Sequence, residues 1–499
     1  MTIGWTLVCQ TIIEPFKMIK SRIDIKNFIL EIESKFPVNQ WKIGSIHIWP
    51  YLRIKLFFYL IHSIEKSEVK NREEKPKSKE FFLKSTYRNV RAVFRYYRWL
   101  KSLPKKKYIF VGADAHRVDH RDTRFNRYFD ILIEKYEIQS DSIYFEYGLN
   151  SGKQYNKDLI FTFSEALKGF LYLKKFNKLP QNVHLEGYDS FLVFLSKDAL
   201  FNRYITIYSK ELVTQWAHEK LYPKVLFFKK VFQLIKPEKV LILCYYLDDI
   251  FALTAAANQL KIRTIEMQHG PQSNVHLAYS NWSTLPESGY DMIPKNFWCW
   301  DQGSYNVIHD WTKNNQNYSV KVIGNPWIDY WKAKEMNYKH QNFILYSLQP
   351  NPLTLNQLFP ESIVDFIKNS PYKWFIRLHP RQLNEKDTIK SFLKSKGVLE
   401  LINLDEATTD PLPLLLSKAT LHLTHFSGTA IEASFFNVYT VLLNEIGVFS
   451  FQDLISLQKA VYLNPNEADF QQNLHTIIQY NTNLLGDKNA TSVQTNLFE

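Results

Sequence analysis

The sequence has few cysteines, no long apolar run and no repeat of short period. Its three cysteines, Cys9, Cys244 and Cys299, are odd in number and far apart, so they predict neither a disulfide framework nor a C-x-x-C metal site. No segment has about eighteen uninterrupted apolar residues, and the start of the chain lacks the pattern of a signal peptide. These absences predict a protein of the reducing cytoplasm that is neither secreted nor membrane-spanning.

Several motifs of large enzyme classes are absent as well. The chain contains no G-x-x-x-x-G-K-[ST], no G-x-G-x-x-G and no G-x-S-x-G motif. P-loop NTPases, ordinary dinucleotide oxidoreductases and α/β-hydrolases are therefore disfavoured. A D-x-D signature is also absent.

What is present is a long, aromatic and basic chain of 499 residues, which predicts two or more packed cores. Hydrophobic residues make up 45% and charged residues 22%, with 36 Phe, 29 Tyr and 12 Trp, so a globular protein with a large core is expected. The formal net charge is +13, which favours anionic partners. Residues 65–107 contain fifteen Lys/Arg and five Asp/Glu and therefore hold +10 of that excess.

The basic excess is concentrated in the N-terminal region. Residues 1–104 are predicted to be a helical extension, with an exposed Lys/Glu-rich connector at 65–80. A helix predicted at 85–103 carries two neighbouring faces, one of arginines and one of apolar residues: Arg88, Arg91, Arg95 and Arg98, and Val90, Phe94 and Tyr97. Two interpretations stay open, a solvated face and a face that contacts a membrane surface or another anionic partner.

From residue 107 onward, short apolar runs alternate with helical segments, which is typical of parallel sheets with crossover helices. The first Rossmann-like domain is predicted at 105–295 with strands at 108–112, 142–147, 239–245 and 263–267, and helices near 124–135, 161–176, 191–221 and 248–260. The second is predicted at 296–480 with strands at 297–300, 320–323, 343–347, 374–378, 399–404, 421–425 and 439–443, followed by a tail at 481–499. Two such α/β domains would face each other across a central cleft, where ligands bind.

In the second domain, the segment THFSGTAIEASFF (424–436) follows a strand and starts a helix. Ser427, Gly428 and Thr429 would place free N–H groups, hydroxyls and the positive end of the helix dipole at one point, which suits a phosphate. Glu432 would lie one turn further, in reach of ribose hydroxyls. The alternative is an ordinary Ser/Thr N-cap with a glutamate on the helix surface.

The segment IRLHPRQ (376–382) ends another strand of the second domain. Pro380 constrains the loop, and His379 is presented at the sheet edge between Arg377 and Arg381. Such a histidine can donate to a phosphate or protonate a leaving group, and the pairing with the Ser427 region favours this interpretation over a loop histidine without a role.

The segment EMQHGPQS (266–273) ends the last predicted strand of the first domain. Gln268, His269 and Gly270 are expected to face the cleft, where His269 is a candidate for acceptor contact or acid–base work, the alternative being an ordinary turn histidine. Nearby, Asp248 and Asp249 are either helix-capping residues or include a general base.

The loop at 112–130 is crowded with His, Asp and Arg. Asp114 directly follows a strand and is the first candidate for a base, while Arg117 and His120 are candidates for gripping an anionic acceptor. A metal held by His116, Asp119 and His120 is an alternative, disfavoured because the interspersed arginines would repel a cation.

The motif order resembles a known enzyme family. The order is QHG (268–270), GNP (324–326), YSLQP (346–350), RLHP (377–380) and SGTAIEA (427–433). It resembles bacterial surface-polysaccharide glycosyltransferases of the GT-B fold over residues 105–480, with capsule and lipopolysaccharide enzymes related to Kdo transferases and polysialyltransferases as the closest likeness. The IWPYLR segment (48–53) is similar to an N-terminal feature of such proteins.

The resemblance implies that the second domain binds the nucleotide donor. In relatives that use CMP-activated acidic sugars, the HP and serine-rich motifs hold the nucleotide phosphate, which corresponds to His379, Pro380, Ser427, Gly428 and Thr429, and less directly to Glu432. A first-domain carboxylate acts as base in the family, but the LDDI segment lacks the glycine of the family motif, so the base stays open. The resemblance also implies that no bound metal or other cofactor is needed.

The expected function is a cytoplasmic glycosyltransferase at the inner face of the inner membrane. It would move a sugar, such as a Kdo- or sialic-acid-like ulosonic acid, from a nucleotide donor to a surface glycan or lipid-linked acceptor. Asp114 would deprotonate the acceptor, and His379 would stabilise the departing phosphate. The alternatives are a CDP-polyol phosphotransferase of the teichoic-acid type, a sugar-nucleotide epimerase, and a nucleic-acid-binding protein, although no nucleic-acid recognition module is found.

Overall fold

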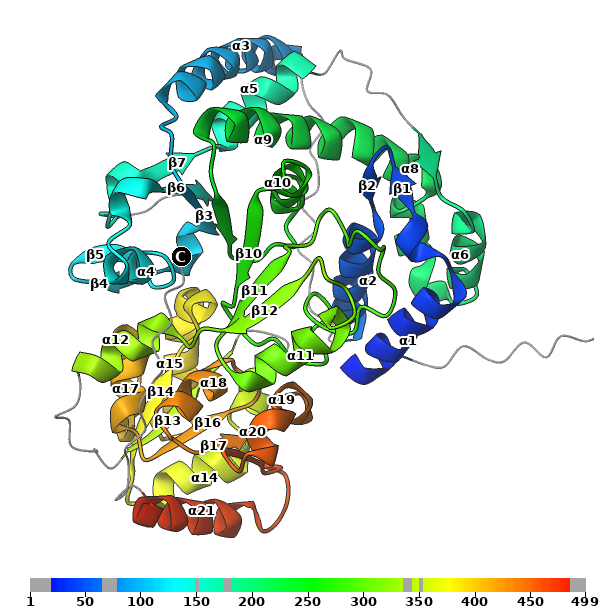
Figure 1. The fold of residues 1–499 in the computed structure, drawn as a ribbon. Coiled ribbons are helices and arrows are strands. Elements are labelled where there is room, and N and C mark those ends of the chain that lie inside the picture. The colour runs from blue at the N-terminus through cyan, green and yellow to red at the C-terminus, as the bar shows by residue number, and fades with distance from the viewer. Residues whose placement is uncertain are drawn as a thin grey trace, which may run out of the picture.

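The computed structural model describes residues 19–64, 79–148, 152–174, 182–334, 343–349 and 353–484. Two parallel β-sheets with surrounding helices form two Rossmann-like domains, which lie one above the other in Figure 1. This architecture confirms the predicted α/β fold of GT-B type. The side chain of Arg88 and all but the first four residues of the predicted 481–499 tail lie outside the described residues.

The first sheet is parallel and has seven strands among the described residues. Their order across the sheet is β12 (Ser319–Val322), β11 (Asn296–Cys299), β10 (Arg263–Met267), β9 (Lys239–Ile242), β3 (Tyr108–Ala113), β6 (Ser142–Tyr147) and β7 (Ile160–Thr162). The helices before and around it are α1 (Arg22–Lys35), α2 (Trp49–Ile64), α3 (Lys79–Ser102), α4 (Asp130–Lys135), α5 (Ser164–Lys174), α6 (Tyr188–Leu195), α7 (Asn202–Ile207), α8 (Lys210–Trp216), α9 (Tyr222–Ile235), α10 (Asp248–Gln259) and α11 (Gln302–Thr312). The central strands β3 and β9 are nearly continuous apolar runs, because parallel strands covered on both faces bury almost every side chain.

The second sheet is parallel as well. Its order is β15 (Ile402–Asn403), β14 (Lys373–Arg377), β13 (Phe343–Ser347), β16 (Leu421–Thr424), β17 (Thr440–Leu442) and β18 (Ala460–Tyr462). Its helices are α13 (Leu355–Leu358), α14 (Glu361–Asn369), α15 (Lys386–Ser395), α16 (Asp405–Thr409), α17 (Leu412–Lys418), α18 (Thr429–Phe435), α19 (Glu445–Ser450), α20 (Gln452–Ser456) and α21 (Phe470–Leu484). The helix α12 (Pro326–Lys334) follows the last strand of the first sheet and precedes the first strand of the second.

The first sheet extends beyond the predicted domain boundary at residue 295. Strands β11 and β12 were expected in the second domain, but β11 pairs with β10 and β12 pairs with β11, both in parallel register. The first strand of the second sheet in sequence is β13, which starts at Phe343. Strand existence is a local property of the sequence, whereas the sheet that a strand joins depends on distant pairing partners.

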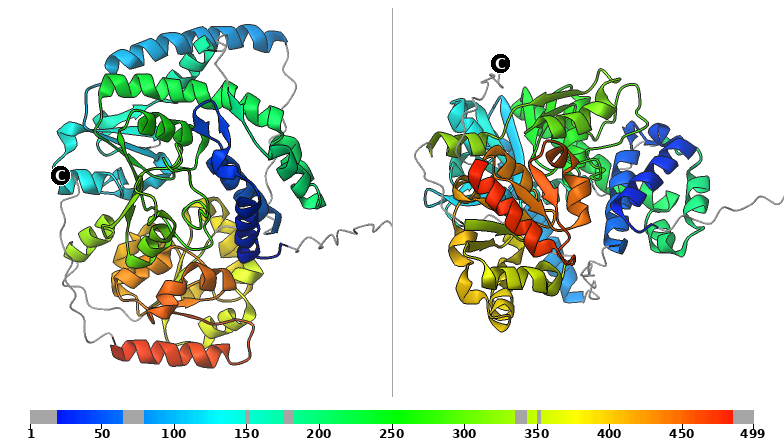
Figure 2. Two further views of the ribbon diagram at one scale, coloured as in Figure 1. Left: turned by 45° about the vertical axis from the view of Figure 1, so that its right-hand side comes forward. Right: turned by 90° about the horizontal axis from the view of Figure 1, so that it is seen from below.

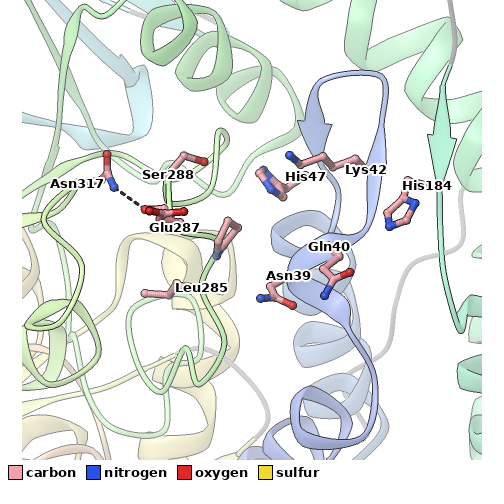
Figure 3. A pocket seen from close by; sticks show the side chains of 10 residues that line it. Asn39, Gln40, Lys42, His47, His184, Leu285, Glu287, Ser288 and Asn317 are labelled. Atoms are coloured by element: carbon pink, nitrogen blue, oxygen red, sulfur yellow. Dashed lines mark hydrogen bonds between the residues drawn. The ribbon is translucent and has the colours of Figure 1, made fainter.

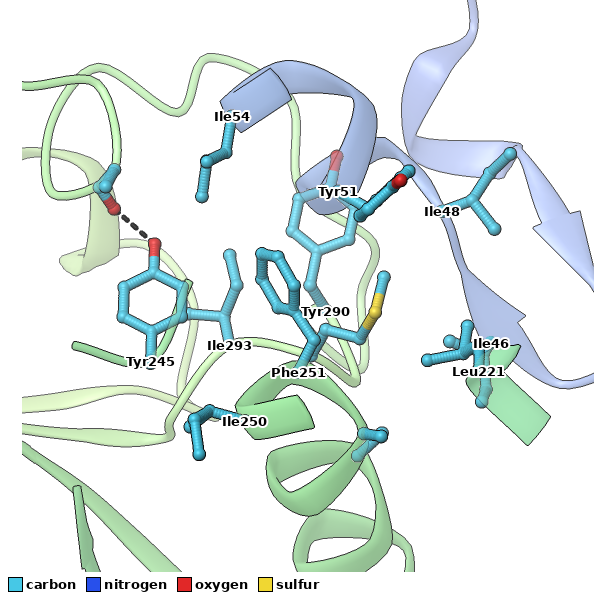
Figure 4. Packing of buried hydrophobic residues seen from close by; sticks show 14 of the residues in the cluster. Ile46, Ile48, Tyr51, Ile54, Leu221, Tyr245, Ile250, Phe251, Tyr290 and Ile293 are labelled. Atoms are coloured by element: carbon cyan, nitrogen blue, oxygen red, sulfur yellow. Dashed lines mark hydrogen bonds between the residues drawn. The ribbon is translucent and has the colours of Figure 1, made fainter. Parts of the chain in front are cut away.

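The described residues of the N-terminal region, 19–64 and 79–104, are largely helical as predicted, and many of them belong to the core of the first domain. Most of the predicted connector at 65–80 lies outside the described residues. Side chains of residues 46–54 pack with Tyr245, Phe251 and Tyr290 in one buried cluster (Figure 4). A small antiparallel sheet of β2 (Ile46–His47), β1 (Lys42–Ile43) and β8 (Val183–His184) joins the same region to the first domain. Residues 19–64 are therefore part of the first domain's body, unlike the separate extension that was predicted.

The IWPYLR segment (48–53) acquires a structural role from Arg53. This side chain is fully buried, and its Nε donates to Glu33 Oε1 at 2.7 Å. Its Nη2 donates to the backbone carbonyls of Ser280 and Asn281 at 3.1 and 2.7 Å. A buried arginine needs all of these partners, because an unpaired buried charge is strongly destabilising. The network therefore anchors the long segment after β10 to helices α1 and α2.

Two further predictions of local structure were wrong in part. The predicted helix at 191–221 is divided into α6, α7 and α8, which are separated by short turns with Asp198 and Ser209 as N-caps of the following elements. Only the second half of the predicted helix near 124–135 forms, as α4, because residues 124–126 belong to β5 (Thr123–Asn126), which pairs with β4 (Arg117–His120) in a β-hairpin. In both cases capping and turn residues outweigh the apolar periodicity.

Candidate functional site

Loops from the carboxyl ends of the two sheets meet at the boundary between the domains. A Cβ atom on Gly428, just before α18, would lie only 2.9 Å from Cδ of Pro271 in the loop after β10. Arg127 Nη1 of the first domain lies 3.4 Å from Glu432 Oε1 of the second. A pocket of about 360 Å³ opens between the domains and is lined by residues such as Gln272 and Ile431. The structure thus brings the QHG and SGT motifs together.

Arg127 is a charged side chain of the first domain that reaches the second domain. Its side chain is about a quarter exposed, and Nη2 donates to the Tyr128 hydroxyl at 2.8 Å. That hydroxyl donates in turn to the carbonyl of His269 at 2.9 Å. Burial lowers the pKa of His116, His269 and His379, and the positive charge of Arg127 lowers all three further. Histidines of both sheet edges therefore lie in the field of one arginine.

His379 occupies the N-cap position of the short 3₁₀ turn that follows β14. Its Nδ1 accepts from the backbone N–H of Arg381 at 3.1 Å, and its own N–H donates to Gln382 Oε1 at 3.1 Å. Burial, followed by the charges of Arg381 and Arg127, lowers the pKa of His379 to about 4. The imidazole is therefore neutral at neutral pH, and because Nδ1 accepts, the proton resides on Nε2. His379 presents a hydrogen-bond donor without a charge.

The neighbours of His379 hold the loop in place. Arg377 Nη1 donates to the carbonyls of Ala407 and Asp410, both at 2.6 Å, and burial lowers its pKa to about 10. Pro380 occupies the first position of the 3₁₀ turn and fixes its backbone. Arg377 thus holds α16 and the residue that follows it, and direct contact of Arg377 with a phosphate stays a prediction.

The Ser427–Thr429 segment uses its polar groups within its own domain. The N–H of Ser427 donates to Thr424 Oγ1 at 3.2 Å, and the N–H of Thr429 donates to Ser427 Oγ at 3.4 Å. The Thr429 hydroxyl bonds Nε2 of the fully buried His422 at 3.1 Å. The N-cap of α18 is Gly428, and no side chain of the described residues caps this helix. Glu432 is buried and paired with Arg127, so the alternative of a Ser/Thr N-cap with a surface glutamate is not observed. Phosphate binding by Ser427, Gly428 and Thr429 stays a prediction.

Asp114 lies at the carboxyl end of β3, as predicted. It is 9% exposed, and its Oδ1 accepts from Gln154 Nε2 at 3.2 Å. Arg124 Nη2 lies 3.8 Å from its Oδ2. Its role as a base stays a prediction.

The sequence predicted a role for His269 but none for its neighbour Glu266. Glu266 is fully buried at the end of β10, where its Oε1 accepts from the Tyr279 hydroxyl at 2.8 Å and from the Cys244 N–H at 3.2 Å. His269 Nδ1 lies 3.7 Å from the same oxygen. Burial raises the pKa of Glu266 well above its usual value and lowers that of His269 to about 4. The sequence signal that could have identified Glu266 is a single acidic residue within a buried apolar strand.

The Glu266–His269 pair has unused hydrogen-bonding capacity. Among the described residues, neither Glu266 Oε2 nor His269 Nδ1 has a hydrogen-bond partner. His116 approaches from the β3 side, with its ring centre 5.8 Å from that of His269. Two neutral imidazoles and a buried carboxyl thus form an acid–base cluster at the first sheet edge.

Two residues predicted to bind the acceptor are internal to the first domain. Arg117 has a fully buried side chain whose Nε donates to Glu146 Oε1 at 2.7 Å, with Nη1 at 3.6 Å from Asp130. Gln268 is 1% exposed, accepts from the Trp300 N–H at 2.6 Å and donates to Ser304 Oγ at 2.9 Å. Both predictions were wrong, because partners from distant segments enclose these side chains.

The other two predicted acceptor residues have different environments. His120 lies among Phe125, Trp327, Tyr330 and Trp331, bonds the Tyr330 hydroxyl at 3.2 Å, and thereby joins β4 to α12. The role of His120 in gripping an acceptor stays a prediction. A Cβ on Gly270, in contrast, would meet nothing within 4 Å, so Gly270 borders open space.

The residues of the metal alternative and the aspartates Asp248 and Asp249 lie in separate surroundings. In the described part of the chain, no group of three or more His, Cys, Asp or Glu side chains is placed to hold a metal ion, and His116 and His120 have separate surroundings. Asp248 and Asp249, in the first turn of α10, pair with Lys55 and Lys224 at 2.8 and 2.5 Å. The N-cap of α10 is Leu247 and no side chain of the described residues caps it, so the capping interpretation of the two aspartates is not observed, and a role as general base stays a prediction.

A larger open pocket of about 760 Å³ lies next to the small antiparallel sheet. Figure 3 shows Lys42, His47 and His184 on one wall, with Glu287 and Asn317 on the other. None of the predicted site residues lines it. The meeting point of the two sheet edges is therefore the candidate active site.

The chain is similar to solved structures at low sequence identity. No protein-family model matches it, and no curated protein matches it in sequence. The UDP-GlcNAc 2-epimerase of Methanocaldococcus jannaschii, solved with UDP-GlcNAc and UDP, is 17% identical, covers 77% of this chain and 93% of its own, and has a TM-score of 0.42. The Neisseria meningitidis UDP-GlcNAc 2-epimerase is 15% identical over 75% and 92%, with a TM-score of 0.43. The trehalose 6-phosphate synthase of Burkholderia multivorans is 10% identical over 75% and 89%, with a TM-score of 0.39.

Proposed function

We propose that this chain is a nucleotide-sugar glycosyltransferase whose reaction takes place between the two sheet edges. The observation that carries the proposal is the junction of the two sheet edges, where Arg127 of the first domain lies 3.4 Å from Glu432 of the second. The charge of Arg127 lowers the pKa of His116 and His269 in the first domain and of His379 in the second. A site between two Rossmann-like domains that combines fixed positive charge with neutral imidazoles suits an anionic donor and a proton-transfer step.

The donor is proposed to bind with its phosphate beside His379. Nε2–H of His379 donates to a phosphate oxygen, while Arg127 and Arg381 supply positive charge. The sugar is proposed to be a CMP-activated ulosonic acid of the Kdo or sialic-acid type, as the motif resemblance implies. Its carboxylate adds a second negative charge, which the positive charges of Arg127 and Arg381 favour. The proposal requires no metal, since the arginines neutralise the phosphate.

In the proposed reaction, an acceptor hydroxyl attacks the anomeric carbon of the sugar. A bond forms between that oxygen and the anomeric carbon, the bond from the anomeric carbon to the phosphate oxygen breaks, and the nucleotide leaves with the electron pair. The hydroxyl proton passes to a base of the first domain, for which His269 and Asp114 are the two candidates. His379 stabilises the charge that develops on the leaving phosphate, where a positioned donor is most effective.

Nucleotide-dependent thermal stabilisation tests the donor assignment. CMP, CDP, UDP, GDP and dTDP are compared at equal concentration, and a ligand at about 100 times its Kd stabilises the native state by about 2.7 kcal/mol. We expect CMP to raise Tm most, and we expect His379→Ala to lose this response. The exposed His309→Ala is the matched control and should keep it.

Product analysis then tests the reaction class, with a glycan or lipid-linked oligosaccharide as acceptor. A glycosidic product that requires the acceptor supports the proposal. Phosphodiester-linked polyol would assign a CDP-polyol phosphotransferase instead, and acceptor-independent conversion of a UDP-sugar to its C2 epimer would assign an epimerase. A protein stabilised by none of the five nucleotides would contradict the proposal altogether.

A further inference from the structure

The outer face of α3 combines exposed basic and exposed apolar side chains. Among residues 90–102, the four ionisable side chains other than tyrosine are all basic, namely Arg91, Arg95, Arg98 and Lys101. Three apolar or aromatic side chains stand on the same exposed surface: Val90 at 44%, Phe94 at 73% and Tyr97 at 49% exposure. Exposure of nearly three quarters of a phenylalanine is costly in water unless another surface covers it.

The opposite face fixes α3 against the body of the protein. Ala92 and Tyr96 are buried, and the α3 backbone approaches α5 so closely that a Cβ on Gly169 would clash with the Ala92 carbonyl oxygen. Trp99 stacks on Phe227 of α9, with ring centres 5.8 Å apart. Because the inner face is packed in this way, the exposed face of α3 has a defined orientation.

The positive charge of this face is largely unneutralised. Arg95 pairs with Glu165 at 3.0 Å, and both side chains are about half exposed, so this pair is weak. In the part of the chain that the structure describes, Arg91, Arg98 and Lys101 have no ion pair. An anionic surface would therefore find several unpaired cations beside apolar side chains.

The location of α3 suits contact with an extended surface. In Figure 1 and in the left view of Figure 2, α3 lies at the outer margin of the first domain, above α5 and α9 and on the side away from the second domain. No helix of the described residues is long and apolar enough to cross a bilayer. A helix that lies along the outside can rest in the plane of a membrane interface.

We propose that the outer face of α3 binds the surface of an anionic lipid bilayer. Arg91, Arg98 and Lys101 contact lipid phosphates, while Phe94 and Val90 enter the boundary between headgroups and acyl chains. The exposed aliphatic and phenyl groups favour a bilayer over nucleic acid, which basic residues would bind through phosphates without needing Val90. This inference goes beyond the proposed reaction and does not depend on it.

Sedimentation of the full-length protein with vesicles tests the proposal. The vesicles are pure phosphatidylcholine or phosphatidylcholine with roughly one third phosphatidylglycerol, and binding is expected only to the second kind. Arg91→Glu/Arg98→Glu should lower the partition coefficient about 20-fold or more, since each lost basic residue alone accounts for roughly 5-fold. Phe94→Ala should lower it roughly 5-fold. Point variants are required because α1 and α2 lie in the core, so deletion of residues 1–104 would disturb the fold.

A charge-matched double variant on the second domain provides the control. Lys373→Glu/Lys394→Glu changes two exposed lysines away from α3 and should bind as the wild type does, within about 2-fold. All variants should keep the wild-type Tm and the same nucleotide response. Failure of the wild type to bind anionic vesicles, or an equal loss in the control, would overturn the proposal. Salt-dependent binding to random duplex DNA that the α3 variants lose, without vesicle binding, would assign the face to nucleic acid.

Discussion

The carboxyl edges of the two sheets carry different kinds of side chain. The first edge has neutral imidazoles, those of His116 and His269, in front of the buried carboxyl of Glu266. The second edge has neutral imidazoles as well, those of His379 and of the buried His425, which directly follows β16 and bonds the Tyr346 hydroxyl at 2.9 Å. Its buried carboxyl, that of Glu432, is paired with Arg127, and the hydroxyls of the Ser427–Thr429 segment are occupied within their own domain. The first edge therefore has the groups for proton transfer, and the second offers a positioned donor for an anion.

Arg117 has a fully buried side chain in the first domain, and its replacement is expected to have the largest effect on stability. Arg117→Ala leaves Glu146 and Asp130 buried without their cation and should lower the free energy of unfolding by about 3–5 kcal/mol. Urea unfolding followed by circular dichroism measures this. Arg95→Ala, which removes an exposed ion pair, is the control and should cost less than about 1 kcal/mol. Unchanged stability with a raised KM for the acceptor would show that Arg117 belongs to the binding surface.

His379 tests the role of the second edge. His379→Ala removes the donor proposed for the leaving phosphate and should lower kcat about 100- to 1000-fold, because removal of one positioned donor has an effect of this size. Tm should stay near that of the wild type, since the side chain only caps a surface turn. The measurement is steady-state transfer at saturating donor, beside His309→Ala. Near-normal turnover of His379→Ala would mean that the second edge does not act on the leaving group.

Arg127 tests whether the two edges work as one site. Arg127→Met should lower kcat/KM for the donor about 10- to 100-fold, as expected for the loss of a hydrogen bond from a charged group. Because the Arg127 charge lowers the pKa of His269 and His379, its removal should raise both pKa values. The acid limb of the pH–rate profile should then move to higher pH.

The control for Arg127 is its own partner. Glu432→Gln removes the facing carboxylate and keeps Arg127 in place, so the acid limb should not move upward. An unmoved acid limb in Arg127→Met would show that the two edges titrate independently.

Much of this framework was predictable, because buried parallel strands are short apolar runs that can be recognised locally. The bounds of β6 and β10 agree with the prediction, and His269, His379 and Ser427 were correctly expected at strand ends. The sheet to which β11 and β12 belong was not predictable, since it depends on pairing between segments far apart in sequence.

The burial of single polar side chains was the main gap. Arg117 and Gln268 were expected to reach an acceptor, but Glu146 and Ser304 enclose them, and nothing in the local sequence reveals such partners. Arg127 was one of several arginines in a crowded loop, and only the tertiary structure places it opposite Glu432. Local pattern thus predicts where a strand ends more reliably than which side chain remains accessible there.

Replacement of Glu266 tests whether the buried carboxyl of the first edge is protonated in the folded protein. Burial raises the pKa of Glu266, so the folded protein keeps this proton at pH values at which the unfolded chain has already released it. The contribution of Glu266 to stability is thus fully present below the pKa of the unfolded chain. It is lost as pH rises from there through the folded-state pKa, by about 1.4 kcal/mol per pH unit. Glu266→Gln keeps the side-chain shape and does not titrate. The variant should therefore gain stability relative to the wild type as pH rises from about 5 to about 8.

Urea unfolding of both proteins at the two pH values measures this difference, and all other titrating groups cancel in the comparison. Turnover at neutral pH should change by less than about 3-fold, because a protonated carboxyl and an amide both present one oxygen to Tyr279 and Cys244. A stability difference that is constant with pH would mean that Glu266 is already ionised in the native state. His269 would then face a carboxylate, and the first edge would carry a buried negative charge.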